Sequence, residues 1–117
     1  MTDERRGAVA AVDSVLVALA DPTRRQLLDL LAAQGEATAT TLAERLPVSR
    51  QAVVKHLAVL DAAGLVSRSR VGREARYAVQ PAALDATARW IAALAADWDR
   101  RLANIKRVPE AAEQDSR

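Results

Sequence analysis

Side chains that can bind phosphates or read base edges gather between residues 45 and 76. This segment holds seven Lys or Arg and two Asp or Glu, for a net charge of +5, whereas residues 1–44 carry −3 and residues 77–117 carry no net charge. Lys and Arg displace the counterions condensed on DNA phosphates, so such a segment favours sequence-independent affinity for DNA. A solvated face without a partner would show its positive charges dispersed. The focus on one segment therefore indicates contact with nucleic acid.

A helix inside this segment has one apolar side and one polar side, as a DNA-recognition helix does. Ser49 can cap its N-terminus and Gly64 can end it. One stripe of the helix is apolar and consists of Val53, Leu57 and Leu60. The opposite side is small or hydrogen-bonding and consists of Gln51, Lys55 and Ala58. Such a helix can approach base edges in the major groove without bulky groups in the way.

The residues after this helix predict a β-wing. Two alternating segments, 65–70 and 75–79, are joined by a short turn at Gly72, which supplies the glycine that a hairpin needs. A recognition helix followed by a hairpin is the layout of a winged helix-turn-helix protein. We expect Arg73 and Arg76 to contact phosphates or enter the minor groove. The candidate DNA-binding residues are Thr38, Thr40, Ser49, Arg50, Gln51, Val54, Lys55, His56, Arg68, Arg70, Arg73 and Arg76.

Four further helices are expected to support this reader. They cover about residues 8–20, 22–34, 38–46 and 81–107. Asp21 caps the second of them, with Pro22 at its first position and Gly35 after its end. Thr38 can cap the third. The predicted fold class is therefore mainly α, a winged helix-turn-helix domain of about five helices with a two-stranded β-wing.

Apolar residues on the last helix predict a dimer. Leu84, Ile91, Trp98 and Ile105 recur every seven residues, and this seam is longer than the core of one small domain requires. Packing on the domain's own core is the alternative, and we favour dimerisation through the first and last helices. The candidate interface residues are Val9, Val12, Leu16, Leu84, Ile91, Trp98, Leu102 and Ile105.

Length and composition limit the remaining possibilities. We expect one domain over residues 8–107, a flexible start over 1–7 and a disordered tail over 108–117. No apolar run approaches the ~20 residues of a membrane span, and the start lacks a signal-peptide core, so a cytoplasmic location is expected. With one His, no Cys and no phosphate-cradling glycine loop, the chain is not expected to be an enzyme or to hold a cofactor or metal. A winged helix used only for protein interaction is the alternative function, although it would not need the +5 segment.

Three runs of sequence together resemble the ArsR/SmtB family of bacterial repressors. They are ALADPTRRQLLDLL, TLAERLPVSRQAVVKHLAVLDAAGLV and GREARYAV, within roughly residues 11–107. The resemblance implies a homodimeric winged helix whose first and last helices form the interface. It also implies a double-stranded DNA operator and an inducer, a small molecule or a protein, that releases the protein from it.

The chain departs from the metal-sensing members of that family. Their thiolate motif would fall on TLAERLPV, which has no Cys, and the last helix has Asp85, Asp97 and Asp99 but no His. Zinc-type and arsenic-type sites need soft or imidazole ligands. The one imidazole, His56, is expected to bond backbone or phosphate at the helix boundary. Val54 stands where the family often has serine, and could touch a thymine methyl group.

We therefore predict that metals do not act as inducers. Stoichiometric Zn²⁺, Cd²⁺ or arsenite should leave the protein on its DNA, because the chain offers no thiolate and one imidazole. Binding titrations with and without each metal check this. A tight stoichiometric metal isotherm coupled to DNA release would contradict it.

Overall fold

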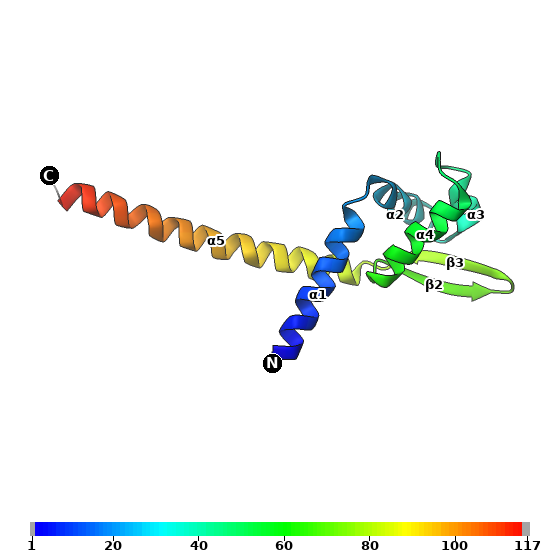
Figure 1. The fold of residues 1–117 in the computed structure, drawn as a ribbon, viewed down its shortest axis with the longest axis horizontal. Coiled ribbons are helices and arrows are strands. Elements are labelled where there is room, and N and C mark those ends of the chain that lie inside the picture. The colour runs from blue at the N-terminus through cyan, green and yellow to red at the C-terminus, as the bar shows by residue number, and fades with distance from the viewer. Residues whose placement is uncertain (1, 116–117) are drawn as a thin grey trace. The chain divides into compact units, whose positions relative to one another are not determined.

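The computed structural model describes the backbone of residues 2–115 and the side chains of residues 11–106 (Figure 1). The chain divides into two compact units, residues 1–87 and residues 88–117. The elements in chain order are α1 Thr2–Leu19, α2 Pro22–Gln34, β1 Ala37–Thr38, α3 Ala39–Ala43, α4 Arg50–Ala62, β2 Val66–Val71, β3 Glu74–Val79 and α5 Ala82–Asp115. Five helices and a small antiparallel sheet confirm the predicted fold class over the described residues.

Three helices have different limits from those expected. α1 begins at Thr2 and α5 continues to Asp115, so helix covers most of the two segments predicted to be flexible or disordered, 1–7 and 108–117. Lengthening a helix that already exists adds hydrogen bonds without a new nucleation cost. Pro109 is the exception within α5, because it has no N–H to donate. α3 ends at Ala43 rather than near residue 46. The residue before Pro47 avoids helical backbone angles, which favours a turn over a longer α3.

The core of residues 1–87 is built around the buried stripe of α4. Val53, Leu57 and Leu60 are fully buried, as their spacing of four and then three residues predicted. The partners from other elements that are also almost fully buried are Val15 and Ala18 of α1, Leu27 and Leu31 of α2, Leu42 of α3, and Leu65. α4 has 13 residues, a length that is marginal for an isolated helix in water. Its helical state therefore depends on this burial.

Two arginines of α2 close the end of α1. The last carbonyls of a helix have no partner inside it and carry partial negative charge. Arg24 donates from Nε to Ala18 O at 2.7 Å and from Nη2 to Val17 O at 2.9 Å. Arg25 donates from Nη1 to Leu19 O at 2.6 Å. The start of α2 thus fixes the chain reversal between the first two helices.

The sheet has one strand more than predicted. Its order is β1-β3-β2, and the two-residue β1 pairs with β3 through Ala37 opposite Tyr77 and Thr38 opposite Arg76. The β2–β3 hairpin is the predicted two-stranded wing, and β1 extends it to an antiparallel sheet of three strands. A two-residue strand is too short to show alternation, so the sequence pattern could not reveal it. At the β2–β3 turn Gly72 has φ +63° and Arg73 does not have a positive φ, which matches the first central position of a type II′ hairpin turn.

Asp21 gives the fold a testable pH dependence. Its side chain accepts from the N–H groups of Thr23 at 2.8 Å and Arg24 at 3.3 Å. Partial burial alone would raise the pKa of Asp21, yet these two donors, with Arg24 and His56 nearby, hold the pKa below its ordinary value of 3.8. A carboxyl whose pKa is lower in the folded state stabilises the fold above its unfolded pKa, and this contribution disappears as pH falls through the folded value.

We predict that Asp21→Ala lowers the melting temperature at pH 7 and that its difference from wild type shrinks below about pH 4, near the unfolded pKa. Thermal unfolding followed by circular dichroism from pH 2.5 to 7 measures it. Ser49→Ala is the matched control, because Ser49 caps α4 with a neutral oxygen that accepts from Ala52 N at 3.1 Å. The prediction is wrong if the Asp21→Ala deficit is as pH-independent as that of the control.

Candidate nucleic-acid interface

The solvent side of α4 carries the residues expected to read bases. Gln51 and Lys55 are exposed, and they lie about 160° around the helix from the buried Val53 at 100° per residue. Ser49 caps the helix N-terminus, also at the surface. Neither Gln51 nor Lys55 is held by a hydrogen bond or ion pair within the part of the chain that the structure describes. Both side chains are therefore available to a partner.

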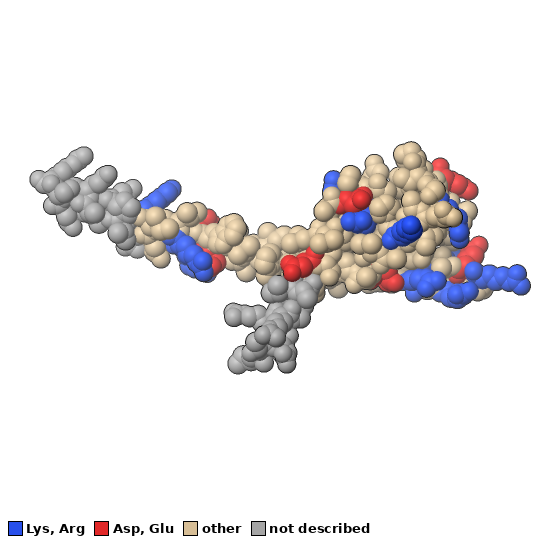
Figure 2. Space-filling model, in the orientation of Figure 1, with Lys and Arg blue, Asp and Glu red and all other residues tan. Residues whose placement is uncertain are grey.

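Positive side chains gather along the β2–β3 hairpin. Figure 2 shows Lys and Arg concentrated there. Arg68 and Arg70 lie on β2 and Arg73 lies at the turn. None of the three forms an ion pair with a carboxylate among the described residues. The hairpin thus presents free positive charge.

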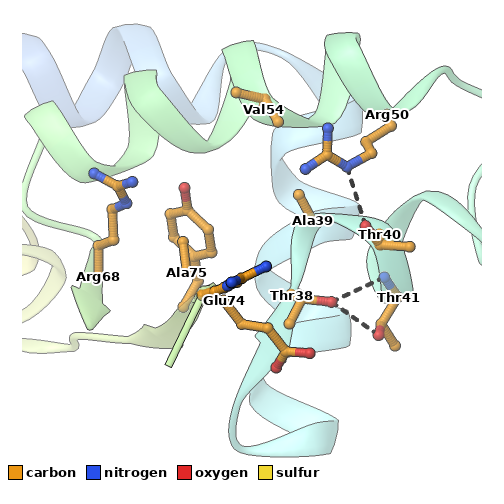
Figure 3. Close-up of a pocket in the computed structure, with 11 residues that line it drawn as sticks. Thr38, Ala39, Thr40, Thr41, Arg50, Val54, Arg68, Glu74 and Ala75 are labelled. Carbon is orange, nitrogen blue, oxygen red and sulfur yellow. Dashed lines mark hydrogen bonds between the residues drawn. The ribbon is translucent and has the colours of Figure 1, made fainter. Parts of the chain in front are cut away.

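A groove of about 450 Å³ separates α4 from this hairpin (Figure 3). Arg50 and Val54, four residues apart on α4, line one side, and Arg68 of β2 lines another. Arg50 donates from Nε to the Thr40 hydroxyl at 3.0 Å, which fixes its guanidinium at the edge of α3. The full lining is Thr38, Ala39, Thr40, Thr41, Arg50, Val54, Arg68, Arg73, Glu74, Ala75 and Tyr77. Three arginines against one glutamate make the groove suitable for an anion.

The structure brings together only half of the candidate DNA-binding residues in that groove. They are Thr38, Thr40, Arg50, Val54, Arg68 and Arg73. Thr38 also accepts from Thr41 N at 3.2 Å and so caps α3. Val54, which is 39% exposed, faces the groove with Arg50 instead of sharing the outer side with Gln51.

Arg76 differs from the other arginines of the wing. Its Nη1 lies 3.3 Å from Glu36 Oε1, and its Nη2 lies 3.5 Å from Glu74 Oε2. Successive residues of a strand face opposite sides, so Arg76 lies on the other face of β3 from Tyr77. Its charge is thus already balanced, and it links the start of β1 to the wing.

His56 is half-buried and lies away from both the groove and the outer side of α4. Its Nδ1 is 3.4 Å from Nη1 of Arg24, the residue that closes the end of α1. A guanidinium can only donate hydrogen bonds, so Nδ1 is the acceptor in this contact. His56 therefore connects α4 to the junction of α1 and α2.

Tyr77 and Arg24 are important to this region and were not among the sequence candidates. Tyr77 is buried on the inner face of β3, and it also lines the groove. The strand alternation that puts Tyr77 on the same face as Ala75 was visible in the sequence, whereas the groove was not. Arg24 gave no signal beyond its position in the first turn of α2, because its contacts depend on helix packing.

The candidate dimer residues divide between the two units. In the first unit Val12 is buried at 5% exposure, whereas Leu16 and Leu84 are 41% and 42% exposed. The side chain of Val9 lies outside the described residues. In the second unit four apolar residues of α5 are exposed by 47–63%, namely Ile91, Trp98, Leu102 and Ile105. Each unit therefore carries apolar side chains in contact with solvent.

The described residues include no cluster of three or more His, Cys, Asp or Glu side chains placed to hold a metal ion. Among the described helices, none is both long enough and apolar enough to cross a membrane.

The chain is similar to known transcriptional regulators. Residues 19–68 match the family model described as a helix-turn-helix domain. The transcriptional repressor SdpR of Bacillus subtilis is 34% identical over 80 residues, which are 68% of this chain and 88% of that protein. The HTH-type transcriptional regulator Rv2034 of Mycobacterium tuberculosis is 42% identical over 88 residues, 75% of each chain.

The chain is also similar to solved structures of transcriptional regulators. An ArsR-like transcriptional regulator from Rhodococcus sp. RHA1 is 49% identical, with a TM-score of 0.79 over 87% of this chain and 95% of that one. The homodimeric winged helix-turn-helix DNA-binding domain Mb0332 from Mycobacterium bovis, a possible ArsR-family regulator, is 30% identical with a TM-score of 0.62 over 85% and 88% of the two chains. The chain therefore belongs to the ArsR family of winged helix-turn-helix transcriptional regulators, which is not a family of enzymes.

We predict that Arg76 acts on the fold through Glu36. Arg76→Ala and Glu36→Ala should each lower the unfolding free energy by about 0.2–1 kcal/mol, the range for an exposed ion pair. The double variant should cost less than the sum of the two, because both single changes remove the same pair. Urea unfolding of the four proteins measures the coupling, and Arg73→Ala serves as the unpaired control. Strict additivity would show that the pair contributes nothing.

Proposed function

We propose that this regulator binds double-stranded DNA as a homodimer and acts as a repressor at a (pseudo)palindromic operator. One observation carries the proposal. The free polar side of α4, with Gln51 and Lys55, lies next to a groove that holds Arg50, Arg68 and Arg73. This arrangement combines groups that read base edges with groups that bind the backbone.

The apolar residues of α5 support the dimer. Four exposed residues at successive spacings of seven, four and three residues form one stripe of that helix, and a second copy would remove this stripe from water. A two-fold dimer presents two copies of α4, so it fits an operator of two half-sites about 34 Å apart, one turn of DNA. The similar Mycobacterium bovis domain is itself homodimeric.

The proposal that the protein represses transcription is made by analogy with the repressor SdpR. The same proposal includes a cytoplasmic location, where the DNA lies. An inducer that is not a metal ion would release the protein from its operator. Binding and release of DNA require no catalysis by the protein.

Gel-shift titration with the DNA upstream of the protein's own gene tests the proposal. A scrambled duplex of the same composition is the control. We expect a retarded complex on the upstream DNA at a concentration at least tenfold lower than on the scrambled duplex. Equal or absent binding on both would instead favour a winged helix used for protein interaction.

We predict that Trp98→Glu or Ile91→Asp gives a monomer and abolishes operator binding. A charge placed in an apolar interface costs on the order of several kcal/mol. Sedimentation velocity at micromolar concentration measures the mass, and Ala93→Glu, on the opposite side of α5, is the matched control. A wild-type protein that already sediments as a monomer would contradict the dimer.

We also predict that reading and anchoring are separable. Gln51→Ala or Lys55→Ala should each cost about 1–3 kcal/mol on the operator and much less on scrambled DNA. Arg73→Ala should weaken binding to both DNAs, and it should lower the slope of log K against log salt by nearly two, since a dimer loses two phosphate contacts.

Arg76→Ala is the matched control for Arg73→Ala, because the ion pairs with Glu36 and Glu74 already balance its charge. It should change that slope less. Titrations at several salt concentrations, on operator and scrambled DNA, provide all these values. Equal effects of all four variants on both DNAs would mean that the reading face is misplaced.

A further inference from the structure

Tyr77 has a hydroxyl group that the fold leaves without a partner. The residue is only 7% exposed, and its ring belongs to the core of the first unit. Within the described residues the hydroxyl makes no hydrogen bond or other polar contact. Buried tyrosine hydroxyls usually have a hydrogen-bond partner in the protein or in water, so the partner of this hydroxyl comes from outside the described chain.

The Tyr77 hydroxyl opens to the groove. No described side-chain oxygen or nitrogen is both fully shielded from solvent and unpaired, so the Tyr77 oxygen must reach solvent. Tyr77 is among the residues that line the groove between α4 and the wing. Both of its neighbours in the sheet, Arg68 on β2 and Ala37 on β1, come from paired strands, which hold the ring in place.

The charges around the groove select the chemistry of its occupant. Arg50, Arg68 and Arg73 line it with one carboxylate, Glu74, which lies 3.5 Å from Arg76. Arg50 is tied to Thr40 through Nε alone, so its Nη groups remain free among the described residues. A phenol hydroxyl beside arginines can donate to an oxyanion, and such charge-assisted bonds are among the stronger ones.

We propose that Tyr77 is a DNA-binding residue that donates its hydroxyl hydrogen bond to one backbone phosphate seated in this groove. The inference rests on the proposed DNA binding and adds a contact to it. Since β3 fixes the ring and α4 forms the opposite wall, this bond sets the separation between wing and recognition helix on the DNA. Tyr77 thereby helps to fix the register of α4 without reading a base.

Tyr77→Phe tests the proposal, because it removes one oxygen and keeps the ring. We expect operator affinity to fall about tenfold per groove, with loss on scrambled DNA as well and little change in melting temperature. Ser67→Ala, which deletes a hydroxyl from the opposite face of the wing, is the matched control and should bind as wild type does.

The phosphate is located by comparing wild type and Tyr77→Phe on DNA in which single phosphates have been neutralised. Methylphosphonates, which lack the charged oxygen, are placed one position at a time along the operator. At one position per half-site the substitution should weaken wild-type binding more than it weakens binding of Tyr77→Phe, because both proteins lose the attraction between the arginines and the phosphate and only the wild type also loses the Tyr77 bond. Because Tyr77 is the only tyrosine, 3-fluorotyrosine gives a single ¹⁹F resonance, which should shift with the unmodified duplex and not with that methylphosphonate duplex.

The other outcomes distinguish failure of the Tyr77 assignment from failure of the proposed function. Wild-type affinity in Tyr77→Phe, or equal sensitivity of both proteins at every methylphosphonate, would overturn the assignment of Tyr77 while leaving DNA binding intact. Failure of the wild-type protein to bind any duplex would instead overturn the proposed function, and the Tyr77 contact with it.

Discussion

The structure depends on holding α4 by one face only. A helix of 13 residues needs tertiary burial to persist, and Val53, Leu57 and Leu60 provide it against α1, α2, α3 and Leu65. Burial along one stripe also fixes the rotation of the helix, so Gln51 and Lys55 must point outward. His56 adds a polar contact with Arg24, whose guanidinium already binds the last carbonyls of α1. The buried side of α4 is thus held by the core, while its exposed side remains available to a partner.

The arginines of the described chain include one group that stabilises the fold and another that borders the groove. Arg24 and Arg25 satisfy helix carbonyls, and Arg76 pairs with Glu36 and Glu74, so these charges serve the fold. Arg50, Arg68 and Arg73 border the groove instead. A count of positive residues would treat both groups alike. Among the described residues the second group forms no ion pair and binds no backbone carbonyl, and its one side-chain partner is the Thr40 hydroxyl bound by Arg50, so the second group is the one that a DNA backbone can recruit.

Local signals in the sequence were enough to find the helices that present the site. Asp21 with Pro22, Ser49, Gly35 and Gly64 mark helix limits because caps and left-handed glycines act within a few residues. The features that the sequence did not reveal join distant residues. β1 meets β3 across 40 positions, Arg76 meets Glu36 across 40, and Arg24 meets His56 across 32. Such pairs depend on the packed fold, and so does the groove that gives Tyr77 its role.

The central claim is that the outer side of α4 and the groove beside it together contact DNA. Backbone amide chemical-shift mapping of the ¹⁵N-labelled protein tests this most directly, with the upstream duplex added to saturation. The account predicts that the largest shifts fall in residues 49–56 and 68–77, while the apolar side of α1 that faces solvent, at Leu16 and Val17, stays unchanged. Shifts confined to α1 and α5, or an unperturbed wing, would contradict it.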